Sequence, residues 1–377
     1  LKNFKSSINE KLKNRGTINV FRAWTGGKET SWKLTNPNIN RYNLYWNVFD
    51  GENTPMEKFS GVASSTKVSP NLLNLHAINW NMNYTYTEFD DYPGIDRYIT
   101  KKQWFHEDEH GETVTVKFWD DSYPSYLSEL AKDSLLKNNA DGIMLDWWQD
   151  KQLLKSTGLS ISQVRKATTN IAKSLRNTLG DHAIILGNVG WTFNETTTKY
   201  ISGVFLELYK SPGVKRYNTN EIFKMEKLLS FYDKTLQSPR LIAMAPWRVS
   251  KLNDPLAIPP DSKENIQYAK LFTAMTVVVP KNGYILYSDN HWDTDDEDYG
   301  SVYYDFYNFD IGKPTSEYIK VSSGVGYKEH EQGFIAYNIN SNKKKLTRDN
   351  GQSFEIAGRS GLFCRDLGND TECLPID

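Results

Sequence analysis

The stretch Asp141-Gly-Ile-Met-Leu-Asp-Trp-Trp148 decides how the chain is interpreted, because it joins an apolar run to a carboxylate and two indoles. Its centre, Gly142 to Leu145, predicts a short buried strand of a parallel sheet, since such strands are covered on both faces. In a barrel of parallel strands the chemistry lies at the C-terminal ends, where Asp146 would stand. A carboxylate beside flat rings suits a sugar; the alternative is a capping aspartate beside core tryptophans.

Strand-like and helix-like segments alternate around this stretch, which predicts parallel strands joined by crossover helices. Apolar residues at helical spacing fill most of the gaps, as in 125–137 and 161–179. The pattern predicts an α/β fold, a (β/α)8 TIM barrel. The alternative is a doubly wound open sheet, which usually carries a Gly-rich phosphate turn that this sequence lacks. The predicted strands are 43–48, 72–80, 114–119, 142–146, 183–188, 203–208, 241–246 and 284–288.

Three parts are expected along the chain. Residues 1–40 are mostly polar and predict an N-terminal extension packed on the barrel. Residues 41–315 hold the alternating segments and predict the catalytic (β/α)8 barrel. Residues 316–377 contain short strands and turns without helical spacing, which predicts a small antiparallel, β-sandwich-like C-terminal domain.

Charge and cysteine content limit the partners and the compartment. Lys and Arg number 45 and Asp and Glu 46, so there is no general electrostatic reason to bind nucleic acid or an anionic membrane. No apolar run approaches the roughly 20 residues that span a bilayer. Cys364 and Cys373 are expected to form a disulfide, although two free thiols are the alternative. A disulfide implies an oxidising compartment, so we expect a secreted, extracellular or periplasmic protein.

Tryptophans recur at the ends of the predicted strands. A buried indole needs a partner for its N–H, so a rim of indoles favours a platform for a pyranose ring over simple core filling. Two or three of them are nevertheless expected to pack loops onto the barrel. Asn188, Arg248 and Asp289 also follow strands and could bind sugar hydroxyls. The tryptophans of the predicted rim are Trp46, Trp80, Trp119, Trp147, Trp191, Trp247 and Trp292.

Two acids are the candidate catalytic pair. Asp146 closes the fourth predicted strand and Glu207 lies at the end of the sixth. Even-numbered barrel strands contribute to the same side-chain layers, so the two carboxyl groups can converge on one pocket. Apolar neighbours would raise the pKa of Glu207 by desolvation, as a proton donor requires, whereas Asp146 would need polar neighbours to stay ionised. The alternative for Glu207 is a salt-bridged acid at a strand end.

No metal or cofactor site is predicted. The acidic run 293–298 offers oxygen ligands for calcium but lacks the glycine and glutamate of an EF-hand loop, so a solvated acidic loop is favoured. The six histidines show no zinc-binding spacing.

With these residues placed, the chain resembles glycoside hydrolases of the hypothetical glycosyl hydrolase (GHL) type, which are barrels distantly similar to the α-amylase and α-galactosidase groups. The resemblance rests on 141–148, 203–207 and 311–338, and covers roughly residues 40 to 340. It implies a barrel followed by a β-sandwich tail. In the α-galactosidase group an Asp ending strand four is the nucleophile and an Asp ending strand six is the acid/base. That implies a retaining mechanism with Asp146 and Glu207, the latter a departure from the family pattern.

The sequence therefore predicts an enzyme, a glycosidase (O-glycosyl hydrolase) that degrades a poly- or oligosaccharide with two carboxyl groups. Carbohydrate is the expected partner, without nucleic acid or membrane. The alternative is a non-catalytic glycan-binding barrel of a cell-surface or adhesion system, which would keep the tryptophans and dispense with the paired acids.

Overall fold

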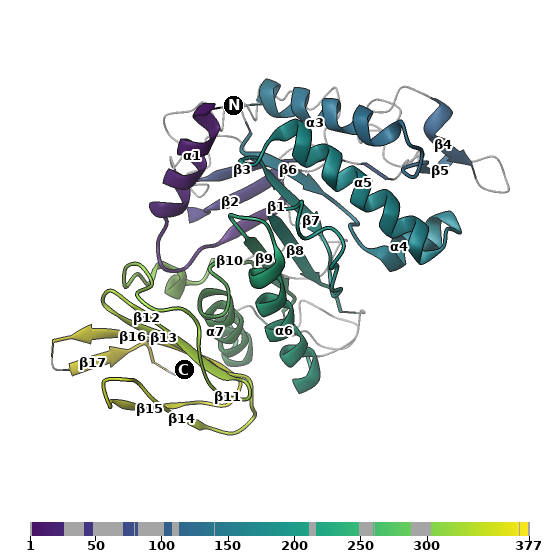
Figure 1. Cartoon of the computed structure of the whole chain (residues 1–377). Helices are drawn as coiled ribbons and strands as arrows, with labels where there is room; N and C mark the ends of the chain where they lie inside the picture. Colours follow the sequence, from purple (N-terminus) through teal and green to yellow (C-terminus); the bar gives the residue numbers. More distant parts are fainter. Residues whose placement is uncertain are drawn as a thin grey trace. The chain divides into compact units, whose positions relative to one another are not determined.

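The structure is a computed structural model that describes residues 2–25, 41–47, 71–78, 80–81, 102–107, 113–138, 140–210, 216–248, 259, 261–287, 303–368 and 370–375. Eight strands form one sheet in the order β1-β2-β3-β6-β7-β8-β9-β10, which is their order along the chain (Figure 1). Within each compact unit described below, neighbouring strands of this sheet pair in parallel. The predicted (β/α)8 barrel is confirmed. The strands are β1 (Phe21–Thr25), β2 (Leu44–Asn47), β3 (Leu73–Ile78), β6 (Gly142–Leu145), β7 (Ile184–Asn188), β8 (Gly203–Leu208), β9 (Leu241–Pro246) and β10 (Asn282–Ile285).

The last strand returns to the beginning of the sheet. Val20, the residue before β1, forms a parallel bridge with Ile285 of β10. The N–H of Ile285 also donates to the carbonyl oxygen of Asn19 at 2.9 Å. These contacts join β10 to the segment directly before β1.

Two strand assignments differ from the prediction. Strand β1 lies inside the range predicted as an N-terminal extension, so this part of the range belongs to the sheet. The predicted strand 114–119 is not part of it: β5 (Thr113–Val116) pairs antiparallel with β4 (Phe105–Glu107). Its alternation of Thr and Val differs from the continuous apolar run that is typical of a buried parallel strand. The two differences offset each other: Asp146 directly follows the fourth strand of the sheet, and Glu207 lies in the sixth.

The first of two compact units comprises residues 1–15, 22–205 and 235–239. Its helices are α1 (Lys2–Lys13), α3 (Tyr123–Asn138), α4 (Asp150–Thr157) and α5 (Ile161–Leu179). Helices α3 and α5 lie side by side (Figure 1). Helix α5 has the bounds that its spacing predicts; Ser160 precedes it and forms a capping box with Gln163, and Gly180 follows it as the C-cap. It buries the apolar face that its spacing indicates.

The second unit comprises residues 16–21, 206–234 and 240–377. It holds α6 (Thr219–Thr235), whose last residue falls in the first unit, together with α7 (Lys263–Val278) and the short 3-10 helix η4 (Asp305–Asn308). An antiparallel sheet in the order β11-β12-β13-β16-β17 and a hairpin of β14 and β15 follow (Figure 1). The predicted antiparallel C-terminal region is confirmed, whereas its exact boundary stays a prediction. The strands are β11 (Ile319–Ser322), β12 (Val325–His330), β13 (Gly333–Asn338), β14 (Lys344–Thr347), β15 (Ser353–Ile356), β16 (Ser360–Leu367) and β17 (Asp370–Cys373).

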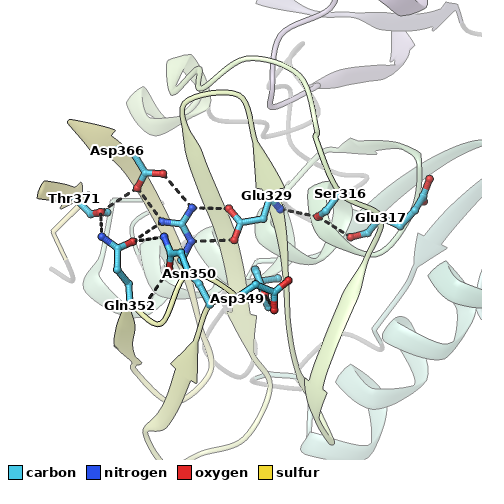
Figure 2. Close-up of polar contacts among 10 residues, drawn as sticks. Ser316, Glu317, Glu329, Asp349, Asn350, Gln352, Asp366 and Thr371 are labelled. Atoms are coloured by element: carbon cyan, nitrogen blue, oxygen red, sulfur yellow. Dashed lines mark hydrogen bonds and ion pairs between the residues drawn. The ribbon is translucent and has the colours of Figure 1, made fainter. Parts of the chain in front are cut away.

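A buried arginine joins the hairpin to this sheet. Arg348 donates to both carboxylate oxygens of Glu329 at 2.9 and 2.6 Å, and to both of Asp366 at 2.9 and 3.0 Å (Figure 2). Its guanidinium also lies 4.5 Å from the ring centroid of Phe334. Because Nε, Nη1 and Nη2 all have partners inside the domain, we interpret Arg348 as a structural residue.

The C-terminal sheet packs on α7 and is held there by buried lysines. Lys328 donates to the carbonyl oxygens of Val277 and Pro280, at 2.9 and 2.8 Å, where α7 ends. A cation at this position satisfies carbonyls that the helix leaves unpaired. Cys364 of β16 and Cys373 of β17 form the predicted disulfide. Among the described residues, no helix combines the length and the apolar character that a membrane span needs.

Candidate active site

Asp146 follows the last residue of β6 and meets Asn188 at the end of the neighbouring strand. Leu145 pairs with Gly187 in the parallel register, which brings Asp146 level with Asn188. Nδ2 of Asn188 donates to Oδ1 of Asp146 at 2.8 Å. The N–H of Gly190 donates to Oδ1 of Asn188 at 3.2 Å, and this contact directs the amide nitrogen towards the carboxylate. Both side chains are buried, with 8% of Asp146 and 2% of Asn188 exposed.

Trp147 binds the same carboxylate from an unusual backbone conformation. Its φ of 54° lies in the left-handed region, which costs a bulky residue on the order of 1–3 kcal/mol. Both its backbone N–H and its indole N–H donate hydrogen bonds to Asp146. Its carbonyl oxygen accepts from the N–H of Gln149 at 2.8 Å. The strained turn thus places two neutral donors on one carboxylate.

These surroundings give Asp146 a pKa in the range where enzymes use acids and bases. Burial raises the pKa of Asp146 to about 6, and the hydrogen bonds from Asn188 and Trp147 oppose that rise. Within the described part of the chain, no basic side chain contributes to this pKa. Asp146 therefore has the polar neighbours that its ionisation requires, and it can gain or lose a proton near neutral pH.

Two buried tryptophans support Asp146 from behind. Nε1 of Trp80 donates to the backbone carbonyl oxygen of Asp146 at 2.7 Å. The ring of Trp80 lies 4.7 Å from that of Trp148, whose Nε1 donates to Oγ1 of Thr197 at 3.0 Å. A Cβ at Gly187 would lie 2.9 Å from the Trp148 ring, so the glycine makes room for it. Trp80 is fully buried, and the prediction that it stacks on substrate is corrected: protein covers its ring.

Trp46 is a second correction to the predicted rim. It is fully buried, and its ring centroid lies 5.0 Å from that of Phe205. Strands β2 and β8, which carry these two residues, are not neighbours in the sheet, so the contact crosses the barrel interior. Residues two apart on a strand face the same side, and Glu207 therefore faces the same side of β8 as Phe205. Its side chain is half-buried.

In the second unit, Tyr217 joins the ends of β8 and β9. Its hydroxyl donates to the carbonyl oxygen of Leu208 and accepts from the N–H of Trp247, both at 2.7 Å. Burial raises the pKa of Tyr217, so it stays protonated and can donate. Trp247 and Arg248 are 6% and 7% exposed, which places both predicted substrate ligands largely under protein. Nothing in the local sequence pattern marks Tyr217 as a site residue.

The other predicted site residues divide into two groups. Trp119 and Trp191 are half-buried and remain candidates for stacking on a sugar. Trp119 also contacts His106, with ring centroids 5.3 Å apart.

Convergence of Asp146, in the first unit, with Glu207, in the second, stays a prediction. The described residues contain no group of three potential metal ligands. Outside the described residues lie Asp289, Trp292 and the acidic run 293–298.

Comparison with solved structures identifies the fold. An α-amylase from Geobacillus thermoleovorans, complexed with acarbose, matches with a TM-score of 0.52 at 13% identity over 92% of this chain and 98% of that chain. A maltogenic α-amylase from Thermotoga neapolitana gives a TM-score of 0.47 at 9% identity over 96% and 97% of the two chains. The glycoside hydrolase domain of PelA from Pseudomonas aeruginosa gives 0.45 at 10% identity over 75% and 97%. No protein-family model and no curated protein matches the chain. The likeness shows that the chain has a (β/α)8 barrel fold that glycoside hydrolases also use.

Proposed function

We propose that this protein is a glycoside hydrolase that cleaves a poly- or oligosaccharide with Asp146 and Glu207. The observation that carries the proposal is Asp146 itself. It lies where a barrel strand ends, is buried, is held by neutral donors, and has a pKa of about 6. The orientation of Glu207 on β8 and the fold support the same function. We also propose an oxidising compartment, which the disulfide between Cys364 and Cys373 favours.

The proposed mechanism is retaining. The Asp146 carboxylate attacks the anomeric carbon while Glu207 gives its proton to the departing glycosidic oxygen. Water, deprotonated by Glu207, then displaces Asp146 and restores both groups. At pH 7 a carboxyl group of pKa about 6 is ionised roughly ten to one, so most molecules have a competent nucleophile. Asn188 and Trp147 hold its oxygens without adding a positive charge that would suppress its reactivity.

The test is a screen of the purified protein against polysaccharides, read by release of reducing ends. On a substrate that the parent cleaves, we expect Asp146→Asn to lower turnover by roughly 10³-fold or more, because the amide cannot attack. The matched control is Asp133→Asn, which changes an exposed acid on α3 and should leave turnover unchanged. Proton NMR of the first product would report its anomeric configuration, and an inverted product would overturn the retaining mechanism.

Two outcomes would reject the assignment. Full turnover by Asp146→Asn would remove this residue from the chemistry. Binding of glycans without hydrolysis of any of them would favour a non-catalytic glycan-binding barrel instead.

A further inference from the structure

Tyr209 is an exposed aromatic residue directly after β8. Its side chain is 48% exposed, while Leu208 before it is fully buried. Its ring meets the ring of Trp247 at 4.6 Å between centroids and an interplanar angle of 73°. Trp247 is largely covered, so the pair has a buried supporting ring and an outer ring that is open to solvent.

The backbone before Tyr209 and the side chain of the residue after it are both held by contacts. The carbonyl oxygen of Leu208 accepts the hydroxyl of Tyr217, which in turn binds the backbone of Trp247. On the other side, Nζ of Lys210 pairs with Glu221 at 2.6 and 2.8 Å and lies 5.3 Å from the ring centroid of Tyr217. A single exposed tyrosine is ordinary on a protein surface. An exposed ring on a fixed backbone is preorganised for binding, because little conformational freedom is lost when a ligand arrives.

Tyr209 also lies close to Glu207. Glu207 is the last but one residue of β8 and Tyr209 is the first residue after the strand, so their Cα atoms are at most roughly 7 Å apart. Because the two residues are this close, a sugar that stacks on the exposed ring of Tyr209 can bring its glycosidic bond near Glu207.

We propose that Tyr209 is a platform for one pyranose ring of the substrate, on the leaving-group side of the bond that is cleaved. The inference rests on the proposed function, because it takes Glu207 as the proton donor. A proton donor lies beside the departing oxygen, so the sugar next to it is the one that leaves. The flat ring selects a pyranose with an apolar face of C–H groups, and Trp247 holds the tyrosine edge-on beneath it.

Binding tests the platform without any turnover. In a Glu207→Gln background, the affinities for maltohexaose, cellohexaose, chitohexaose and N-acetylchitohexaose are measured by calorimetry. We expect one of them to bind, Tyr209→Ala to weaken that binding about tenfold or more, and Tyr209→Phe to retain it. The matched control is Leu136→Ala, which shortens an exposed apolar side chain on α3 and should change nothing. Unchanged affinity in Tyr209→Ala, or no binding of any of the four by the Glu207→Gln protein, overturns the platform.

Kinetics separates the platform from the proposed function. With Glu207 intact, Tyr209→Ala should lower kcat/KM about tenfold on the oligosaccharide. It should leave kcat/KM nearly unchanged on the nitrophenyl glycoside of the same sugar, whose leaving group is not a sugar. An equal loss on both substrates contradicts the leaving-group side. If the protein binds glycans through Tyr209 but hydrolyses none, the proposed function fails and the platform stands.

Discussion

The two ends of β6 each carry an aspartate, and the two aspartates have opposite surroundings. At the N-terminal end, Nζ of Lys11 donates to both carboxylate oxygens of Asp141, at 2.8 and 2.7 Å, and the N–H of Asn74 donates to Oδ2 at 2.9 Å. At the C-terminal end, Asp146 accepts only neutral donors among the described residues, from Asn188 and Trp147. Burial raises the pKa of both carboxyl groups, but only Asp141 has a lysine that opposes the rise.

The contrast shows that the two ends of β6 have different roles: Asp141 contributes to stability, and Asp146 is the candidate catalytic residue. At Asp141 the ammonium of Lys11 partly offsets the cost of burying the carboxyl group, and the ion pair joins α1 to the start of β6. At Asp146 no lysine or arginine among the described residues opposes burial, so the carboxyl group titrates near pH 6 and is mostly ionised at pH 7. The same division is found in (β/α)8 barrels in general, where the active site lies at the C-terminal face and residues at the N-terminal face contribute to stability.

The largest effect is expected from Lys11→Met. The substitution leaves Asp141 buried with no cation, and breaking a buried ion pair from one side costs about 3–5 kcal/mol of unfolding free energy. Turnover per folded molecule should not change, because Lys11 binds the end of β6 away from Asp146. Guanidinium unfolding measures the loss, and an assay corrected for the folded fraction checks the turnover.

The matched control for Lys11 is Lys132→Met. Lys132 pairs with Glu129 at 3.1 Å, but both side chains are well exposed, so the loss should stay below about 1 kcal/mol. Similar losses in the two variants would show that Asp141 does not depend on its partner. The double change of Lys11→Met with Asp141→Asn should recover most of the stability.

The next largest effect is a gain of stability in Asp146→Asn. Because the pKa of Asp146 rises from 3.8 to about 6 on folding, the folded protein binds this proton more tightly than the unfolded chain. The resulting contribution is complete below about pH 3.8 and is lost as the pH rises through about 6. At pH 8 the parent therefore carries a buried charge that costs up to about 3 kcal/mol.

An asparagine avoids that cost but loses part of the hydrogen bonding to Trp147, so a gain of about 1–3 kcal/mol is expected at pH 8. Urea unfolding at pH 8 and at pH 4 measures it, and the gain should vanish at the lower pH. A loss of stability at pH 8 would mean that Asp146 is a structural acid like Asp141.

The local elements of the fold could be predicted from the sequence. The run of apolar residues before Asp146 indicated a buried strand, and the apolar spacing of 161–179 indicated a helix. Both signals are local, since each depends on how one segment is buried. The class of the fold followed from their repetition along the chain.

Partners in space were not predictable in the same way. Phe21–Thr25 and Thr113–Val116 both have the composition of strands, but the strand that each one pairs with depends on distant segments. Trp46 and Trp80 follow the same pattern as Trp147, although protein covers the first two and the third is half-buried. The side of a strand that a tryptophan occupies decides this, and a shift of one residue reverses it.

A smaller effect, a tenfold change per pH unit, is expected in the pH profile of turnover. If Asp146 is the nucleophile it must be ionised, so kcat/KM should fall as the pH drops through about 6. If Asp146 were instead the proton donor, kcat/KM would fall as the pH rises through the same value. Initial rates between pH 4 and pH 9 measure the profile. Persistence of the inflection at the same pH in a residually active Asp146→Glu variant would assign it to another group.

The smallest effect is a shift of that inflection in Asn188→Ala. The amide of Asn188 stabilises the ionised form of Asp146 at 2.8 Å, so its removal should move the inflection upward by about one pH unit. The matched control is Thr197→Val, which removes the hydroxyl that accepts the indole N–H of Trp148 at 3.0 Å. That change should lower stability by about 1–3 kcal/mol and leave the inflection in place. An inflection that moves equally in both variants would mean that general loosening of the site, not the Asn188 amide, sets the pKa of Asp146.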